Sequence, residues 1–485
     1  MNKQKMVYDI NEMPPMKEAI ILAFQHLFAM FGATILVPIL VNLAAGKEVL
    51  TIPVALVTSG IGTLIYILCT KGKSPVYLGS SFAFIVPIAA ASKKAGIAGA
   101  MTGIMAVGLI YIIVAIIIKI AGKKWLEKLL PPVVIGPMII IIGLGLAPSA
   151  ISQIGLADGT TIDFKVVAVA LISFLVTAIV MTKAKGFFKV IPFLIGIITG
   201  YIVAICLGMV DFKPVAEASW ISIPKFKVLF KDYQLNFTAL ITIAPIALVT
   251  LCEHIGDHTS LSHIIGRDLI KDPGLEKTLL GDGIATFVAG LLGGPANTTY
   301  GENTSVVGMT KVASVKVIGL AAIFAIIIGF LGKFTALVST IPNAVLGGVS
   351  LLLYGFIAIN GLKVLIKNQV DFEESKNIIV ASSMLVLGLG GAAIAINSGD
   401  LSLTISGMSL SAIVGIILNC VLPGKEKPIA NLIKEDTRKV KDDINKLKND
   451  IKEELTIELK EDIINSIQEE LKTQNKKGSR KKWKL

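Results

Sequence analysis

The chain is dominated by repeated apolar stretches, and this repetition constrains the fold more than any other feature. The hydrocarbon core of a bilayer is about 30 Å thick, so one helix needs roughly 20 apolar residues to cross it. Stretches that meet or approach this length recur along most of the chain, and there are twelve of them. They span residues 19–41, 53–69, 100–120, 132–146, 166–181, 191–209, 240–255, 279–292, 317–331, 345–359, 378–395 and 408–422.

Charged residues are scarce in the chain, above all before residue 425. Only 16% of the 485 residues are charged, whereas soluble domains carry about a quarter. Of the 46 Lys and Arg residues, 17 lie in residues 425–485, so the remainder is more apolar still. The net charge of +12 comes from loops and from this tail. The composition therefore predicts a multi-pass membrane protein and not a nucleic-acid-binding protein.

Basic residues also predict the orientation in the membrane. With fourteen spans and a cytoplasmic N-terminus, most Lys and Arg before the tail fall in cytoplasmic loops, as the positive-inside rule requires. One external loop is an exception, because it carries Lys213, Lys225, Lys227 and Lys231. We expect a protein of the cell (inner) membrane with both termini cytoplasmic, whose first span is retained and not cleaved as a signal peptide. The four scattered cysteines predict neither a disulfide nor a metal site.

Two further stretches, residues 75–92 and 294–309, are only partly apolar and are interrupted by Gly, Ser, Thr and Asn. They take corresponding places when the chain is divided near residue 235. A Gln25-His26 pair precedes the first stretch, and a Glu253-His254 pair, 228 residues later, precedes the second. The sequence thus predicts an all-α fold of fourteen transmembrane segments in two seven-span repeats of inverted topology. Segments 3 and 10 are broken, as in transporters whose sites form from discontinuous helices.

Three acidic side chains stand among hydrophobic residues: Glu253, Asp257 and Glu302. An ionisable group at membrane depth is costly, so such a residue predicts function unless it reaches solvent at a helix end. Glu253 and Asp257 are four residues apart and share one face of a helix. His254 is expected to turn from that face toward a neighbouring helix. His26 lies within the first span and needs a polar partner, for which a carboxylate of the second broken segment is the natural candidate.

Two more histidines, His258 and His263, are placed near the cytoplasmic end of their span and are assigned no role. The run 293–303 contains Pro295 and several glycines, so it does not form an ordinary helix. Unpaired backbone groups inside a bilayer are tolerated only where protein or a wet cavity satisfies them. The result is a polar pocket with carboxylates, peptide groups and an aromatic wall. Such a pocket suits a flat, neutral ligand rich in N–H and C=O groups.

Four segments together resemble one known family. They are residues 25–33 (Gln-His-Leu-Phe-Ala-Met-Phe-Gly-Ala), 78–84 (Leu-Gly-Ser-Ser-Phe-Ala-Phe), 253–256 (Glu-His-Ile-Gly) and 297–303 (Asn-Thr-Thr-Tyr-Gly-Glu-Asn). This ordered set is similar to the nucleobase/ascorbate transporter family, also called the second nucleobase:cation symporter family, and above all to its uracil-transporting bacterial members. The resemblance covers residues 14–422 and excludes the tail.

The resemblance implies a secondary active transporter and not an enzyme, with a core domain that moves against a gate domain. It implies the domains 1–17 (cytoplasmic N-terminus), 18–125 and 236–338 (core), 126–235 and 339–424 (gate) and 425–485 (cytoplasmic tail). It also implies a homodimer through the gate, surrounded by membrane lipid. Carried over position by position, the substrate-binding residues are Phe82, Glu253, Tyr300, Gly301, Glu302 and Tyr354.

Two residues depart from the pattern of the family. Ser305 stands where the family signature has Gly. Asp257 stands where uracil-transporting members often have His, and this residue is similar to the xanthine and purine members. Glu302 followed by Asn303 favours uracil, since purine members usually have Gln there. We therefore predict uracil as the substrate, with a xanthine or purine permease as the alternative. The acidic residues argue against an anion transporter. A membrane enzyme is disfavoured because the sequence has no metal-ligand cluster, no nucleophile with a paired base and no phosphate-binding loop. A membrane sensor with the charged tail as its output module is a further, lesser alternative.

The coupling ion is predicted to be a proton, and no cofactor or metal is expected. Desolvation disfavours the charged form of a carboxylate, so Glu302 can hold a proton near neutral pH. Asp257 and His26 complete the predicted set for coupling and specificity. In the tail, apolar residues from Val440 to Leu471 recur every three or four positions, which predicts an amphipathic helix.

Overall fold

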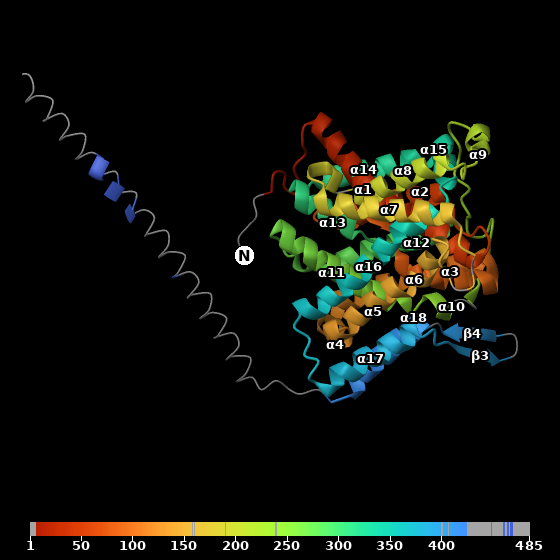
Figure 1. The fold of residues 1–485 in the computed structure, drawn as a ribbon. Helices are drawn as coiled ribbons and strands as arrows, with labels where there is room; N and C mark the ends of the chain where they lie inside the picture. The colour runs from red at the N-terminus through yellow and green to blue at the C-terminus, as the bar shows by residue number, and fades with distance from the viewer. Residues whose placement is uncertain are drawn as a thin grey trace, which may run out of the picture. The chain divides into compact units, whose positions relative to one another are not determined.

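Helices dominate the computed structural model (Figure 1). It describes residues 6–157, 159, 161–189, 191–237, 240–398, 401–405, 407–423, 448, 459–460, 463–464 and 466–468. The first half contains α1 (Met16–Ala45), α2 (Ile52–Cys69), η1 (Phe82–Phe84), α3 (Ile85–Ala121), α4 (Lys124–Leu129), α5 (Pro132–Gly145), α6 (Ala147–Gln153), α7 (Phe164–Lys183), η2 (Gly186–Lys189), α8 (Pro192–Cys206) and α9 (Lys213–Glu217). The second half contains α10 (Leu240–Ile243), α11 (Ile246–Ile265), η4 (Ile270–Gly274), α12 (Leu275–Leu291), α13 (Gly301–Thr310), α14 (Val315–Gly329), α15 (Gly332–Ser339), α16 (Asn343–Lys367), α17 (Ser375–Leu389) and α18 (Gly407–Val421).

The helices have the length and apolar character of membrane spans. Among the described residues, six helical runs are long and apolar enough to cross a bilayer: α1, α2, η1 with α3, α5 with α6, α7 and α16. Four shorter helices, α8, α14, α17 and α18, are also apolar. Each of the twelve apolar ranges predicted from the sequence overlaps a helix. The chain is therefore a mostly helical, multi-pass membrane protein.

The span predicted at residues 240–255 begins too early. The chain turns at Ala244 and Pro245, and α11 starts only afterwards, at Ile246. The helix then continues to Ile265, where Gly266 ends it with a φ of 67°. His258 consequently lies in the interior of α11, fully buried, and not near a helix end as predicted.

Short strands qualify the all-α prediction. The broken segments begin with strands β1 (Leu78–Ser80) and β2 (Asn297–Thr299), which pair with each other. A hairpin of β3 (Ile394–Ser398) and β4 (Leu401–Ile405) follows α17. The predicted span 378–395 therefore ends early, because Gly390 and Gly391, the latter at a φ of 72°, stop the helix. The fold is mostly helical, with strands where glycine and small polar residues interrupt the apolar pattern.

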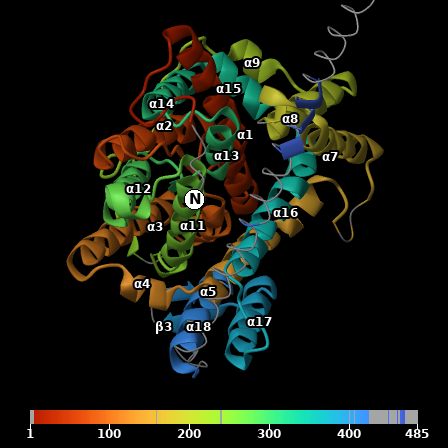
Figure 2. The same cartoon turned by 90° about the vertical axis from the view of Figure 1, so that its left-hand side faces the viewer.

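Helix packing follows matching patterns in the two halves of the chain. α2 packs against α14, and α12 packs against α3. α7 pairs with α8, and α17 pairs with α18. α16 also packs against α7, as α5 does against α17. Figure 2 shows α2, α3, α11, α12, α13 and α14 gathered in one group, α7, α8 and α16 to the right of it, and α17 and α18 below.

The long connection from α8 to α10 is attached to helices of the first of these groups. The Ser222 amide donates to the Phe330 carbonyl at 2.9 Å, and the Lys227 amide donates to the Leu292 carbonyl at 3.1 Å. These bonds link the connection to the ends of α14 and α12.

Residues 423–485 form a second unit. The few residues described there after Pro423, such as 463–464 and 466–468, are helical. Most of the amphipathic helix predicted for the tail lies outside the described residues. It therefore stays a prediction.

Candidate substrate site

The two broken segments meet at their strands. β1 and β2 are antiparallel, and their pairing extends beyond both ends. The Ser81 amide donates to the Ala296 carbonyl at 2.9 Å, and the Tyr300 amide donates to the Tyr77 carbonyl at 3.1 Å. A helix follows each strand directly: η1 with α3 after β1, and α13 after β2. The first amides of a helix have no intrahelical partner. Two sets of free donors therefore lie beside the paired strands β1 and β2, which we call the strand crossing.

Tyr300 connects the strands to α1. Its hydroxyl donates to the Ser80 carbonyl at 2.9 Å and accepts a hydrogen bond from Thr34 Oγ1 at 3.1 Å. The ring lies directly against Gly79, where a Cβ would meet Tyr300 Cζ at 2.3 Å. Glycine at position 79 is therefore what allows the ring to fit under the strand crossing.

Helices α11 and α13 bring the three predicted carboxylates together. Asp257 Oδ2 accepts a hydrogen bond from Thr299 Oγ1 of β2 at 2.5 Å. Its other oxygen would lie 3.9 Å from a Cβ placed on Gly301. Glu253, one turn earlier on α11, interacts electrostatically with Asp257 and with Glu302 in the first turn of α13. All three acidic side chains are partly buried, so they form one acidic site beside the strand crossing.

An aromatic pair joins the strand region to α16. The rings of Phe82, in η1, and Tyr354, in α16, lie 6.4 Å apart between centroids in an edge-to-face arrangement. Phe82 is partly exposed, whereas Tyr354 is buried. This pair brings together two of the three predicted aromatic substrate contacts from distant parts of the chain.

Several buried polar atoms near the strands have no hydrogen-bond partner among the described residues. They are Ser80 Oγ, Ser81 Oγ, Asn297 Oδ1 and Asn303 Oδ1. Buried polar groups are normally satisfied. Their concentration at the two broken segments gives this region unused capacity for binding a polar molecule.

His26 has a different partner from the one predicted. Its Nδ1 is 3.2 Å from Asn303 Nδ2, and the same amide donates to the His26 carbonyl at 3.0 Å. The predicted carboxylate partner was therefore wrong, although the partner does come from the second broken segment. In α13 the side chains of Glu302 and Asn303 point about 100° apart around the helix. Asn303 is buried and holds His26, while Glu302 is partly exposed.

The sequence analysis missed a fourth acidic residue within the membrane region, Asp282 of α12. Asp282 Oδ2 lies 2.8 Å from His254 Nδ1, and both side chains are fully buried. The other ring nitrogen of His254 lies 3.0 Å from Thr278 Oγ1, also on α12. His254 thus contacts a neighbouring helix, as predicted. Asp282 lies between Gly281 and Gly283 inside an apolar run. An acidic residue in such a run indicates a functional or paired group, and this is the sequence signal that could have identified it.

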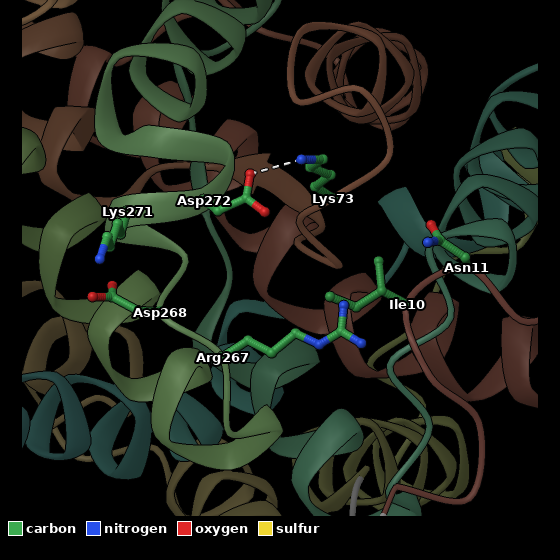
Figure 3. A pocket seen from close by; sticks show the side chains of 7 residues that line it. All are labelled: Ile10, Asn11, Lys73, Arg267, Asp268, Lys271 and Asp272. Atoms are coloured by element: carbon green, nitrogen blue, oxygen red, sulfur yellow. Dashed lines mark hydrogen bonds and ion pairs between the residues drawn. The ribbon is translucent and has the colours of Figure 1, made fainter.

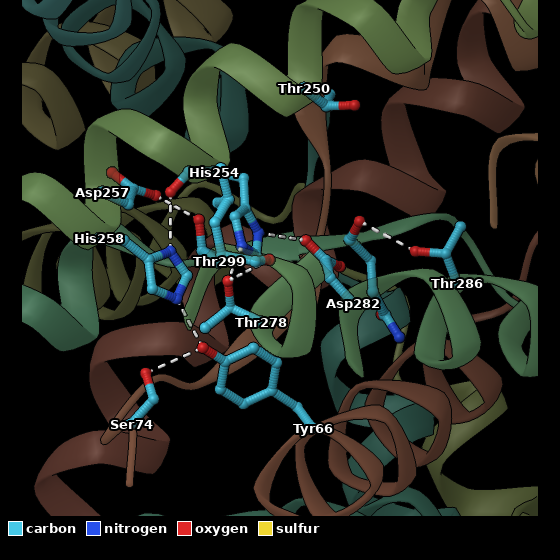
Figure 4. A network of polar contacts seen from close by, with 12 residues as sticks. Tyr66, Ser74, Thr250, His254, Asp257, His258, Thr278, Asp282, Thr286 and Thr299 are labelled. Carbon is cyan, nitrogen blue, oxygen red and sulfur yellow. Dashed lines mark hydrogen bonds and ion pairs between the residues drawn. The ribbon is translucent and has the colours of Figure 1, made fainter. Parts of the chain in front are cut away.

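His258 continues this polar network toward α2 (Figure 4). Its Nδ1 lies 2.7 Å from the His254 carbonyl, and its Nε2 lies 2.5 Å from the Tyr66 hydroxyl. The Tyr66 hydroxyl is also hydrogen-bonded to Ser74 Oγ at 2.8 Å. The role of His258 is not predictable from the sequence, because a histidine alone gives no indication of its partners.

A separate surface pocket lies among charged loop residues (Figure 3). It has a volume of about 660 Å³, and none of the predicted site residues lines it. Lys73 forms an ion pair with Asp272 there at 2.8 Å, and this hydrogen bond lowers the pKa of the Asp272 carboxyl. Arg267 pairs with Asp9 of the N-terminal segment. Cations and carboxylates neutralise each other in this pocket, so it lacks the converging buried groups of the acidic site. It is lined by Ile10, Asn11, Lys73, Arg267, Asp268, Lys271 and Asp272.

Known proteins similar to this chain are membrane permeases. A family model described as "Permease family" matches residues 17–396. The uracil permease of Bacillus caldolyticus is 48% identical over 434 residues, which cover 89% of this chain and 98% of that protein. The uracil permease of Escherichia coli (strain K12) is 40% identical over 414 residues, covering 85% and 93%. The chain belongs to this permease family, the second nucleobase:cation symporter family whose motifs it resembles. It is a transport protein and not an enzyme.

Solved structures of transporters share the fold. The transmembrane domain of the cyanobacterium bicarbonate transporter BicA matches with a TM-score of 0.57 and 17% identity, covering 85% of this chain and all of that one. The murine Solute Carrier 26 family member A9 anion transporter, in the inward-facing state, matches with a TM-score of 0.62 and 11% identity, covering 85% and 69%. At these identities the match concerns the fold alone.

Proposed function

We propose that the chain is a proton-coupled uracil permease and that the acidic site at the strand crossing binds the nucleobase. The observation that carries this proposal is the meeting of Glu253, Asp257 and Glu302 with the two broken segments. The 48% identity to a uracil permease over 98% of its length supports uracil as the substrate.

Uracil matches the chemistry of this site. A carboxylate accepts hydrogen bonds from ring N–H groups, and free amides at helix N-termini donate to exocyclic oxygens. Glu253 and Glu302 supply the acceptors, while the first turns of η1 and α13 supply the donors, including the amide of Gly301. Phe82, Tyr300 and Tyr354 supply aromatic surface for a flat ring. The acidic site disfavours anions, which separates this chain from the anion transporters that share its fold.

The fourteen-segment inverted repeat is part of the proposal. It makes α2 equivalent to α12, α3 to α14, α7 to α17 and α8 to α18. The pairs α2–α14 and α12–α3, α7–α8 and α17–α18, and α16–α7 and α5–α17 are then counterparts of each other, which supports the repeat. The antiparallel pairing of β1 with β2 also fits, because inverted repeats bring equivalent broken segments together from opposite directions.

The domain arrangement follows from the same repeat. Residues 18–125 and 236–338 form the core, and residues 126–235 and 339–424 form the gate. The Phe82–Tyr354 contact then lies between core and gate, where motion of one against the other opens or closes the site. We further propose a homodimer through the gate, with both termini cytoplasmic and lipid around the assembly. The connection around Ser222 and Lys227 moves with the core to which it is bonded.

Proton coupling is assigned to Glu302. Burial in a low-dielectric site disfavours a charged carboxylate. Substrate loading then requires a proton on Glu302, and the neutral loaded core moves past the gate. Asp257 tunes specificity, and His26 acts through Asn303, the neighbour of Glu302.

A xanthine or purine permease is the second candidate, because Asp257 replaces the histidine often found in uracil-transporting members. Binding of nucleobases to the purified protein separates the two candidates. Calorimetry with uracil, xanthine and hypoxanthine is expected to give the tightest binding with uracil. Tighter binding of xanthine or hypoxanthine would assign the site to purines, and no binding of any nucleobase would refute both assignments.

A further inference from the structure

Two histidines of α11 turn away from the carboxylates, and the proposed transport mechanism uses neither. His254 follows Glu253 by one residue and His258 follows Asp257 by one, so the imidazoles lie about 100° around the helix from the acidic side chains. The two rings stack with centroids 4.1 Å apart. Any rotation of α11 about its axis therefore moves the carboxylates and the imidazoles together.

Both imidazoles are fully buried, and each is held by another part of the fold. His254 contacts Asp282 and Thr278 on α12. His258 contacts Tyr66, near the end of α2, and Tyr66 contacts Ser74 in the segment that leads into β1. Figure 4 shows these side chains converging from α2, α11 and α12.

The hydrogen bonds of His258 have a defined direction. A carbonyl only accepts, so Nδ1 donates to the His254 carbonyl, and Nε2 of the neutral ring must then accept. The Tyr66 hydroxyl fills that role at 2.5 Å. Since this uses the one proton of Tyr66, Ser74 donates to the Tyr66 oxygen. Each of these protons takes part in one hydrogen bond. Removing the Tyr66 hydroxyl therefore leaves His258 Nε2, a buried acceptor, without a donor.

We propose that His258, Tyr66 and Ser74 form a positioning unit that fixes the rotation of α11 against α2 and β1. The inference rests on the proposed function, because its consequence is the placement of Glu253 and Asp257 toward the nucleobase. At about 6 Å from the helix axis, a rotation of roughly 20° moves a carboxylate by about 2 Å. Hydrogen bonds weaken steeply over such a displacement. The unit thus contributes to nucleobase affinity without touching the nucleobase.

Tyr66→Phe tests this proposal, because it removes one hydroxyl and keeps the ring. Tyr201→Phe is the matched control: it also removes one hydroxyl that is hydrogen-bonded, to Thr340 Oγ1 at 2.5 Å, but on α8 and away from the contact between α2 and α11. The affinity for uracil is measured by calorimetry on the purified full-length protein, with thermal unfolding recorded in parallel. Tyr66→Phe is expected to raise Kd about tenfold, as loss of a buried hydrogen bond can, and Tyr201→Phe to leave Kd unchanged.

A second pair of variants separates positioning from stability alone. His258→Gln keeps an amide that can donate and accept, whereas His258→Leu removes both functions. We expect Kd to be closer to wild type in His258→Gln than in His258→Leu.

The outcomes distinguish this inference from the proposed function. If Tyr66→Phe lowers the unfolding temperature while Kd stays within threefold of wild type, the positioning unit is refuted and the proposed function stands. Equal Kd values for His258→Gln and His258→Leu would also refute it. A wild-type protein that binds no nucleobase would refute the function on which the inference rests.

Discussion

Replacing Gly79 with alanine should disrupt the strand crossing through a single methyl group. The added Cβ would lie 2.3 Å from Tyr300 Cζ, 2.4 Å from Cε2 and 2.8 Å from the hydroxyl oxygen. Ordinary carbon contacts begin near about 3.5 Å, so the ring must move by more than about 1 Å. That movement breaks the bonds of the Tyr300 hydroxyl to the Ser80 carbonyl and from Thr34.

The cost follows from two contributions. Overpacking a filled site costs about 1–3 kcal/mol, and each lost hydrogen bond about 0.5–1.5 kcal/mol. The sum is about 2–6 kcal/mol. If about 2 kcal/mol of this appears in binding through the displaced Tyr300, Kd for uracil rises about thirtyfold.

The assay combines thermal unfolding in detergent with uracil calorimetry. Gly145→Ala, at the end of α5, is the control, because a Cβ there meets nothing within 4 Å. Alanine favours a helix over glycine, so this variant should unfold at a temperature no lower than that of wild type. Its Kd for uracil should equal the wild-type Kd. A Gly79→Ala protein with the stability and affinity of wild type would show that Tyr300 is not confined by the strand crossing as described.

Three other substitutions test the carboxylates separately. Glu253→Gln should weaken uracil binding by about 2–4 kcal/mol, roughly thirtyfold to a thousandfold, because a charge-assisted bond is lost; near-normal affinity by calorimetry would remove Glu253 from the site. Asp257→His should raise the ratio of uracil uptake to xanthine uptake, and an unchanged ratio would leave Asp257 without a part in specificity. Glu302→Gln should keep some binding while losing accumulation against a gradient; full concentrative uptake would clear Glu302 of any coupling role.

The membrane fold was largely predictable because apolar length is a direct physical requirement of the bilayer. Each of the twelve predicted apolar ranges overlaps a helix. The broken segments were predictable for the complementary reason, since Pro295 and the glycines around it cannot sustain a helix. The pairing of β1 with β2 was not predicted, because two three-residue strands separated by more than 200 residues carry no local signal.

The acidic site was predictable only in part. Charged residues in an apolar run are visible in the sequence, and Glu253, Asp257 and Glu302 do converge. Their partners depend on helix rotation and on contacts between distant segments, which the sequence does not encode locally. His26 therefore received the wrong partner. The partners of His258 were not predicted because α11 continues to Ile265, beyond the predicted end at residue 255, which places this histidine in the helix interior.

Uptake of radiolabelled uracil into membrane vesicles under imposed pH gradients tests the proposed function most directly. Unlabelled xanthine, hypoxanthine, thymine and sulfate serve as competitors in the same experiment. Concentrative uracil uptake should follow an inward proton gradient, collapse with a protonophore and resist competition by sulfate and xanthine. Uptake that follows an imposed sodium gradient and ignores the protonophore would contradict the proton coupling, and efficient displacement of uracil by xanthine would contradict the assigned substrate.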